Sequence, residues 1–337
     1  MERIITTTAK VKENNKEVIK NALIQIGQCT KNMVAKETGL SVATCNTLLN
    51  ELARSGEILE VKIEKKANGA GRPSKTYRLN DQLCLICCLS LYTEGRRQFI
   101  TYQIIDLMSN IISEKTIEEI NIDYKKIHQL IESLLHEHSG IQSVSIGISG
   151  TIDSAQVIDT CDIPLLVGKN LIQDILTDFS LPVVIDNRMN LIAYGLYQQK
   201  AYTSSHSVIA LSFDNDKCND SGIIINGDII HGKSNFAGTI SCLSLQPEYT
   251  RRLLHPTVKV SHEEQIAKAM SLFIAVLNPD VIMLTGQSIS ITLIGPILDA
   301  CKKIIPEEHM PELTFAQDTK SYYITGLAER ALFCLNN

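Results

Sequence analysis

The sequence predicts an α/β protein with a small helical unit at its N-terminus. From about residue 83 onward, apolar runs of strand length alternate with amphipathic runs of helix length, which is typical of α/β proteins with at least partly parallel sheets. Before that point, three short amphipathic stretches end at Gly27, Gly39 and Gly56. The sign of the net charge also differs between the two parts, so we expect two separate units.

The composition is that of an ordinary globular protein. A chain of 337 residues is long enough for two or three domains, and its 44% hydrophobic and 20% charged residues are close to average. The first residues, MERIITTTAKVKENNKE, contain no apolar signal segment, and no apolar run reaches the length of a membrane span. We therefore expect a cytoplasmic protein without a membrane partner.

The overall charge of −5 hides an asymmetry. Residues 1–80 carry 14 Lys and Arg against 8 Asp and Glu, a net charge of +6. The remaining 18 basic and 29 acidic residues give −11. A basic head on an acidic body is typical of a head that contacts a polyanion.

The cysteines favour a reducing compartment rather than a metal site. Three of the ten lie in the apolar run LCLICCLSLY, as Cys84, Cys87 and Cys88, where thiols behave as small buried hydrophobes. A zinc site built on this CxxC would need a second pair, and the sequence has no second CxxC. We expect structural thiols and no metal.

The N-terminal unit has the spacing of three helices. A first helix is expected from about Lys16 to Gly27, with an inward face formed by Val18, Ile19, Ala22, Leu23 and Ile26. Thr30 is a candidate N-cap for a second helix that Gly39 ends, and Ser41 is one for a third helix that runs to about Ser55. The inward residues of these two helices are predicted to be Val34, Ala35, Thr38, Cys45, Leu48, Leu49 and Leu52.

A short helix, a glycine turn and a capped second helix form a helix-turn-helix, a motif that places its second helix in the major groove of DNA. The outward face of that helix carries small or polar side chains, which can reach base edges or phosphates. The stretch ILEVKIEKKANGAGRPSKTYRLN follows, and its alternating apolar residues around a Gly-rich tip predict a β-hairpin, or wing. At the tip, Gly71, Arg72 and Pro73 form an extended cationic element suited to a minor groove.

The candidate DNA-binding residues are Thr30, Lys31, Ser41, Ala43, Thr44, Asn46, Thr47, Lys65, Lys66, Arg72 and Lys75. The alternative is a solvated three-helix unit whose charges only keep it soluble. The charge asymmetry, the capped helix and the basic wing together favour binding to double-stranded DNA.

In the body, strands are expected at residues 83–92, 99–107, 144–150, 181–187, 206–213, 222–230 and 280–286. Helices are expected at about 124–138, 171–179 and 262–277, and from Gly326 to the end. The stretch VVIDNRMNLIAYGLY, residues 183–197, predicts a buried strand that continues into a helix, with polar residues at the join. Ligands of α/β proteins bind at such joins, yet the outward position here holds Arg188.

Taken in order, the head with GRPSK and the segments SIGISGTIDS, IPLLVGKNL, LPVVIDNRMNLIAYG, GIIINGDIIHGKSNFAG and NPDVIMLTGQSIS resemble the ROK family (repressors, open reading frames and sugar kinases). The resemblance spans nearly the whole chain. It implies a winged helix-turn-helix at residues 1–80 and, at 81–337, a two-lobed actin-like (RNase-H-like) ROK domain with a sugar and nucleotide cleft. The first lobe would cover about 81–200 plus the C-terminal helix, and the second about 201–320. The family contains both hexose kinases and sugar-responsive repressors.

The chain departs from the kinase pattern of this family. The catalytic Asp of the motif E-N-D-x-N matches Arg188, and a guanidinium cannot accept a proton. The phosphate loop G-T-G-x-G matches DNDKCNDSG, which keeps only Gly222 and brings Asp214, Asp216 and Asp220 instead. Carboxylates of this kind could hold a cation, but exposed acidic turns are commoner. The family's adenosine-side GG and its D-x-G-x-T strand motif are also missing, so no cofactor is expected.

The sugar motif G-E-x-G-H of the family matches GTISC, residues 238–242, which lacks both the carboxylate and the imidazole that bind sugar hydroxyls. The family's zinc site uses that His and a following cysteine cluster, which Cys242 alone cannot replace. The candidate ligand-binding residues implied by the resemblance are Ser149, Gly150, Asp162, Asp186, Asn187, Arg188, Thr239 and Cys242. Two alternatives remain for Arg188: it pairs with Asp186 or another nearby carboxylate, or it binds an anionic ligand such as a phosphosugar or sugar acid.

The resemblance and its departures imply a DNA-binding transcriptional regulator, a repressor of carbohydrate-related genes, without catalytic residues. Its ROK domain would sense a sugar or an anionic sugar derivative, and would form a homodimer or homotetramer because paired heads multiply a limited affinity. Two rivals remain: a ligand-blind DNA-binding or scaffold protein, and an active ATP-dependent sugar kinase.

Overall fold

A computed structural model describes residues 12, 15–16, 18–20, 22–23, 26–61, 75–80, 85–107, 110–214, 217–240 and 261–335 of the chain. The chain separates into two compact units. One consists of residues 1–85 with the short segments 105–112 and 137–141, and the other consists of the remainder. We call the described residues up to 80 the head and those from 85 onward the body.

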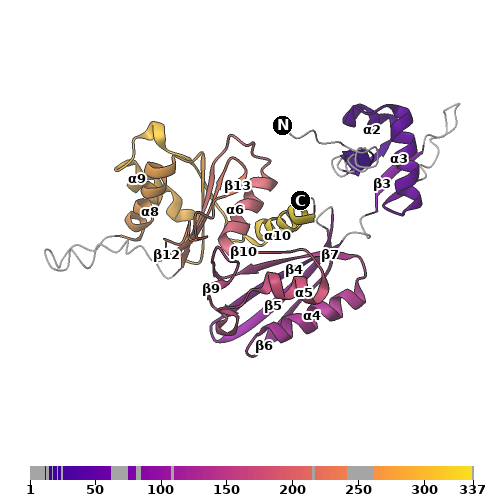
Figure 1. The fold of residues 1–337 in the computed structure, drawn as a ribbon. Coiled ribbons are helices and arrows are strands. Elements are labelled where there is room, and N and C mark those ends of the chain that lie inside the picture. Colours follow the sequence, from indigo (N-terminus) through magenta and orange to yellow (C-terminus); the bar gives the residue numbers. More distant parts are fainter. Residues whose placement is uncertain are drawn as a thin grey trace, which may run out of the picture. The chain divides into compact units, whose positions relative to one another are not determined.

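The head contains the two helices of the expected helix-turn-helix. α2 spans Lys31–Thr38 and α3 spans Val42–Arg54 (Figure 1). Thr30 and Ser41 are the N-caps, as predicted, and their hydroxyls accept hydrogen bonds from the amides of Met33 and Thr44. Gly39 ends α2 at a φ of 69°, a left-handed conformation that glycine adopts without steric cost.

Three short strands complete the head. β1 (Gln28–Thr30), β2 (Ile58–Val61) and β3 (Thr76–Leu79) form an antiparallel sheet in the order β1-β3-β2. β2 and β3 pair as far as Val61↔Thr76, so the chain leaves and re-enters the sheet at facing positions. The tip of the predicted wing, residues 62–74, lies outside the described residues.

An apolar core holds the head together. The inward residues predicted for the third helix are all buried, and Val34, Ile58 and Tyr77 join them. In the first predicted helix, Ile19, Ala22 and Leu23 are buried as expected. Val18 was assigned wrongly to the inward face: its side chain is 43% exposed, because it lies about 100° around the helix from Ile19.

The body holds two five-stranded sheets. The first has the order β10-β7-β4-β5-β6, with β4 at Leu85–Glu94, β5 at Arg97–Asp106, β6 at Ile111–Glu119, β7 at Ile141–Ile148 and β10 at Val183–Asn187. β10 runs parallel to β7, and Asp186 faces Gly147 across the pair. A small hairpin of β8 (Gly150–Ile152) and β9 (Ile158–Cys161) follows β7. The helices in this part of the chain are α4 (Tyr124–Glu137) and α5 (Leu171–Phe179). We call the part of the body that contains this first sheet the first lobe, and the part that contains the second sheet the second lobe.

The second sheet has the order β13-β12-β11-β14-β15, with β11 at Val208–Asp214, β12 at Lys217–Ile225, β13 at Asp228–Ile229, β14 at Val281–Thr285 and β15 at Glu312–Phe315. β12 is antiparallel to β11, whereas β14 is parallel to β11 and β15 is parallel to β14. α8 (His262–Leu277) and α9 (Ile294–Lys302) cover the sheet through a core that includes Leu211, Ile266, Ile282 and Ile297.

Two helices, α6 (Arg188–Gln199) and α10 (Lys320–Leu335), cross at very short range. A methyl group added to Gly195 of α6 would overlap the carbonyl oxygen of Tyr322, and one added to Gly326 of α10 would overlap that of Leu191. The two backbones therefore touch at a point where neither helix has a side chain. This contact fixes α10 against the helix that follows β10.

Most predicted elements are present, but β8, β9, α9 and β15 were not predicted, and the predicted strand 222–230 is divided between β12 and β13. Helices 171–179 and 262–277 have the predicted bounds, but α10 begins at Lys320 rather than near Gly326, because the Asp318 carboxylate accepts a hydrogen bond from the Lys320 amide and supports the first turn. β6 was not predicted, since its sequence IISEKTIEE is largely exposed and charged.

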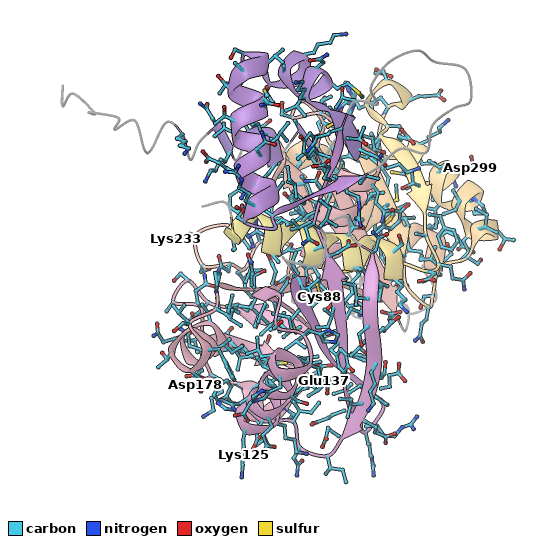
Figure 2. The ribbon with its side chains drawn as sticks, turned by 90° about the vertical axis from the view of Figure 1, so that its right-hand side faces the viewer. Cys88, Lys125, Glu137, Asp178, Lys233 and Asp299 are labelled. Atoms are coloured by element: carbon cyan, nitrogen blue, oxygen red, sulfur yellow. The ribbon has the colours of Figure 1, made fainter. Side chains whose placement is uncertain are left out.

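The surface and interior of the body differ as expected from composition. Figure 2 shows Lys125, Asp178 and Asp299 at the periphery of the body and Cys88 within it. Cys87 and Cys88 are buried on β4, and burial raises the pKa of the Cys87 thiol to about 12, so both act as apolar side chains. Among the described helices, none combines the length and apolar character needed to cross a membrane.

Gly195→Ala is expected to destabilise the protein by about 1–3 kcal/mol, because the added methyl group overlaps the backbone of α10. Urea unfolding measures the effect. Gly295→Ala in α9 is the matched control, since no atom lies within 4 Å of the added methyl group and the change should be neutral or slightly stabilising. Equal effects of the two substitutions would contradict a contact between the backbones.

Candidate functional site

The outward face of α3 carries five of the residues predicted to contact DNA. Ser41, Ala43 and Thr47 are exposed, and Thr44 and Asn46 are half-buried. The hydroxyls of Ser41 and Thr44 lie 2.8 Å apart, and the Thr47 hydroxyl donates to the carbonyl of Ala43 at 3.1 Å. These three hydroxyls thus stiffen the first turns of the helix.

The remaining predicted DNA contacts are spread over the head. Thr30 caps α2, and Lys31 beside it is exposed. Lys75, at the end of the wing, forms an exposed ion pair with Glu60 across the hairpin, with an Nζ–Oε2 distance of 2.7 Å. Lys65, Lys66 and Arg72 lie outside the described residues.

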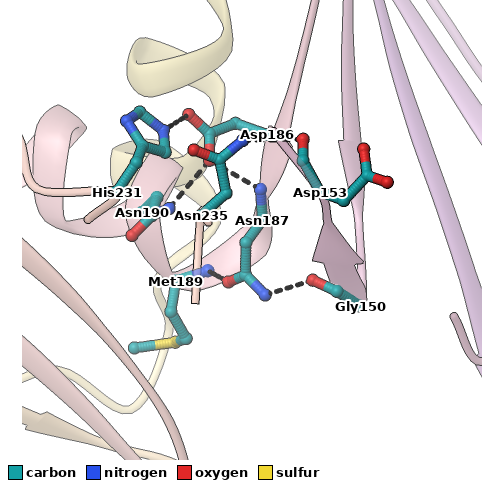
Figure 3. A network of polar contacts seen from close by, with 8 residues as sticks. All are labelled: Gly150, Asp153, Asp186, Asn187, Met189, Asn190, His231 and Asn235. Atoms are coloured by element: carbon teal, nitrogen blue, oxygen red, sulfur yellow. Dashed lines mark hydrogen bonds and ion pairs between the residues drawn. The ribbon is translucent and has the colours of Figure 1, made fainter. Parts of the chain in front are cut away.

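In the body, the Asp186 carboxylate organises the join between β10 and α6 (Figure 3). The residue is only 3% exposed. Its Oδ1 accepts hydrogen bonds of 2.8 Å from the Asn187 amide and from Nδ2 of Asn190, and its Oδ2 lies 2.9 Å from Nε2 of His231. These three partners satisfy the hydrogen-bonding capacity of a side chain that burial removes from water.

Asn187 connects the two lobes of the body. Its Oδ1 accepts from the Met189 amide and caps α6, while its Nδ2 donates to the carbonyl of Gly150 at 2.6 Å and to Oδ2 of Asp220 at 2.7 Å. Gly150 belongs to β8 in the first lobe, and Asp220 belongs to β12 in the second. Burial raises the pKa of Asp220 to about 6, although its bonds with Asn187 and the Ser221 amide partly oppose this.

His231 is the functional candidate that the sequence analysis missed. It follows β13 and lies against Asp186, whose hydrogen bond raises the pKa of the imidazole, while burial and the positive charge of Arg330 lower it. The only available signal was the segment GDIIHG, which places a histidine just after a strand. The sugar motif of the ROK family instead predicts the ligand contacts at residues 238–242.

A small cavity of about 120 Å³ opens beside this network. Its wall combines residues of both lobes, including Gly150, Asp186 and Asn187 of the first and Asp220, His231 and Thr239 of the second. Asn235, whose Nδ2 donates to the carbonyl of Asp153, and Arg330 of α10 complete the polar lining. Four of the predicted ligand residues, Gly150, Asp186, Asn187 and Thr239, therefore meet here.

Arg188 lines a larger, adjoining cleft of about 1020 Å³, which also includes Ser149 and shares Gly150, Asn187 and Asp220 with the small cavity. Its guanidinium carbon is 4.8 Å from the centre of the Tyr323 ring, a cation–π contact. The interpretation that Arg188 pairs with Asp186 or another nearby carboxylate is wrong, because Arg188 forms no ion pair with a described carboxylate and contacts Tyr323 instead. Arg188 begins α6 and its side chain extends to α10 instead.

Of the remaining candidates, Asp162 lines neither cavity. Asp162 is a structural residue: its Oδ2 accepts from the amide and the hydroxyl of Thr93, at 2.7 and 2.9 Å, and fixes the end of β4. Cys242 lies outside the described residues, and so does Asp216 of the acidic loop. Among the described residues, no group of His, Cys, Asp and Glu side chains has the arrangement of a metal site.

Comparisons with known proteins agree with the residue pattern. Residues 97–251 match the sequence model of the ROK family. A xylose repressor of Staphylococcus xylosus is 24% identical over 241 residues, which cover 68% of this chain and 60% of that protein. A xylose repressor of Lactiplantibacillus pentosus is 21% identical over an alignment of 390 residues that covers 98% of each chain. The chain thus spans less than two thirds of the first repressor and nearly all of the second.

Solved structures with the same fold include both regulators and kinases. A ROK family transcriptional regulator described as a homologue of the E. coli MLC protein has a TM-score of 0.67 and 16% identity, covering 96% of this chain and 97% of that one. The ROK hexokinase from Thermus thermophilus has a TM-score of 0.57 and 13% identity, covering 74% of this chain and 99% of that one. At these identities the likeness shows the two-lobed ROK fold and not the activity.

The pair of His231 and Asp186 predicts a pH-dependent contribution to stability. Because the folded pKa of His231 is raised, the stabilisation is complete below about pH 6.5, the unfolded value, and is lost as the pH rises through the folded pKa. His231→Gln should therefore lower the free energy of unfolding by about 1 kcal/mol at pH 6 and by less at pH 9. Denaturant unfolding at both pH values measures this. His309→Gln, at an exposed histidine, is the control and should show no such difference.

Proposed function

Because residues 97–251 match the ROK family model, we propose that the chain is a sugar-responsive, DNA-binding repressor rather than a sugar kinase. The observation that carries most weight is the extent of the likeness to regulators. The repressor from Lactiplantibacillus pentosus aligns over 98% of this chain, and the regulator structure covers 96% of it. The hexokinase from Thermus thermophilus is covered almost completely by only 74% of this chain, which leaves a part that a kinase does not need.

The head would bind DNA as a winged helix-turn-helix covering residues 1–80. The support is its element order, in which β1, α2, α3, β2 and β3 follow one another as a capped helix pair and a hairpin. In this arrangement α3 enters the major groove, so Asn46 and the hydroxyls of Thr44 and Thr47 face base edges. The wing with Lys65, Lys66, Arg72 and Lys75 contacts the adjacent phosphates or minor groove.

The body, residues 81–337, would be a sensor that has lost phosphoryl transfer. Transfer to a sugar hydroxyl needs a base within reach of that hydroxyl, and the family's base position holds Arg188, which is stacked on Tyr323. The small cavity keeps the groups that suit a hydroxylated ligand: an amide, an imidazole and carboxylates from both lobes. A ligand that contacts both lobes can favour one lobe arrangement and so alter operator binding.

A dimer of the body would place two heads on two half-sites. One short recognition helix gives limited affinity, and linking two such helices raises the effective affinity without any new contact. We propose a homodimer, or a homotetramer built from it, on this ground.

The wing assignment is tested with the double substitution Arg72→Ala and Lys75→Ala. Operator binding should weaken, and the slope of log affinity against log salt should fall by about one to two, since about one phosphate contact is lost with each cation. Gel shifts on DNA selected from a random pool measure both. Lys302→Ala with Lys303→Ala, in the body, is the control and should leave binding unchanged, and wild-type binding by the wing variant would contradict the assignment. Asn46→Ala should instead change the preferred bases.

The absence of kinase activity is tested with purified protein, ATP with magnesium, and a panel of neutral hexoses and pentoses. We expect no sugar-dependent release of ADP, because the loss of a general base alone costs about 10²–10⁴-fold in rate. The Thermus thermophilus hexokinase provides the positive control. Steady phosphorylation of any sugar would overturn the proposal. In a separate measurement, operator binding is compared with and without each sugar. Operator binding that no sugar changes would favour the ligand-blind alternative.

A further inference from the structure

Arg330 is an unexplained cation in the wall of the small cavity. It lies on α10, near the C-terminus of the described chain, and contributes to the same cavity as Asp186 and His231. Its Nε is shielded from solvent and has no hydrogen-bond partner among the described residues. A buried arginine donor without a partner is costly and calls for an explanation, and a bound ligand or an ordered water would supply one.

Two aromatic rings hold the guanidinium of Arg330 in position. Its central carbon lies 5.9 Å from the ring centre of Tyr194 on α6 and 5.6 Å from that of Phe333 on α10. Contacts with ring faces use the plane of the guanidinium and leave the N–H groups along its edge available. Those edge donors match the spacing of two oxygens of a carboxylate or phosphate.

The other charges of the cavity are already matched. Asp186 is bonded to His231, whose pKa is raised by this contact, so the two form a compensated pair. Asp220 accepts hydrogen bonds from Asn187 and from the Ser221 amide; burial raises its pKa to about 6, so it stays mostly ionised at pH 7 and loses its negative charge only at lower pH. Glu329 precedes Arg330 but does not line the cavity, since neighbouring helical residues point in different directions. Arg330 is therefore the charged group of this wall that forms no ion pair and no hydrogen bond with another described residue.

We propose that the small cavity binds a hydroxylated anion, a sugar bearing one carboxylate or phosphate, and that Arg330 holds the anionic group. This deepens the proposed function by naming the ligand class of the sensor. Gly150, Asn235 and Thr239 lie along the same cavity and suit the hydroxyl groups of that ligand. Arg188 does not contribute, because it lines the larger cleft and stacks on Tyr323.

The decisive experiment compares ligands that differ only in the anionic group. D-glucuronate and D-xylose share one pyranose ring and differ by the carboxylate on C5, and D-glucose 6-phosphate and D-glucose differ by the phosphate. Isothermal titration of the full chain should show binding of at least one anionic member and about tenfold or weaker binding of its neutral counterpart. The two anions distinguish a carboxylate from a phosphate ligand, and acetate and inorganic phosphate test the charge without the sugar.

Four variants at three arginines assign the effect to a residue. Arg330→Gln should weaken binding of the anion about tenfold or more and leave the neutral sugar unaffected, and Arg330→Lys should be intermediate because it keeps the charge without the planar fork. Arg97→Gln is the matched control, since Arg97 also lies over an aromatic ring, that of Phe99, but outside the cavity. Arg188→Gln tests whether the larger cleft takes part, and this variant should bind the anionic sugar as the wild type does.

His231 supplies a second readout that does not depend on calorimetry. The positive charge of Arg330 lowers the pKa of His231, so an anion bound to Arg330 should raise that pKa further, and so should Arg330→Gln without ligand. Imidazole NMR titrations measure both shifts, and the second one also shows that the variant is folded.

The inference is overturned if no anionic sugar binds, if neutral and anionic members bind equally, or if Arg330→Gln binds the anion as the wild type does. Each of these results leaves the proposed function intact, provided that the head still binds operator DNA. If the wild-type chain does not bind operator DNA, the proposed function is wrong, whereas the result on ligand binding is unaffected.

Discussion

The buried carboxylate of Asp186 is the interaction on which the geometry of the body depends. It lies at the end of β10, where the chain turns into α6, and binds the next amide, a side chain one turn along α6, and His231 from the other lobe. A buried charge without these partners would be strongly unfavourable, so the three contacts and the burial require one another. A strand end, a helix start and a distant histidine are thereby held in one arrangement.

From this point the two sides of α6 serve different purposes. One side forms the cavity with Asp186, Asn187 and Asn190, whose polar groups are largely engaged with one another. The other side meets α10, and there Arg188 stacks on Tyr323 in the larger cleft. Arg188, at the start of α6, therefore lines the larger cleft and not the small cavity, and the arginine that lines the small cavity is Arg330 of α10.

The local features of the sequence were the most predictive. Thr30, Ser41 and Gly39 marked helix ends in the head because caps and left-handed turns are properties of a few adjacent residues. His231 and Arg330 could not be assigned in this way. Their roles come from contacts with residues far along the chain, and no periodicity encodes which side chains of two lobes converge. Arg188 was located correctly at the start of a helix, but the direction of its side chain depends on α10, whose first turn was not predicted.

The crossing at Gly195 and Gly326 limits how the protein can respond to anything that it binds. At Gly195 and Gly326 the two backbones meet directly, and Arg188 on Tyr323 and Arg330 on Tyr194 add side-chain contacts on either side of this point. One helix cannot shift against the other there without a clash of backbone atoms, so we expect α6 and α10 to move together. A change at the cavity wall would then reach α10 directly, and the loops that join this helix pair to the sheets would have to bend.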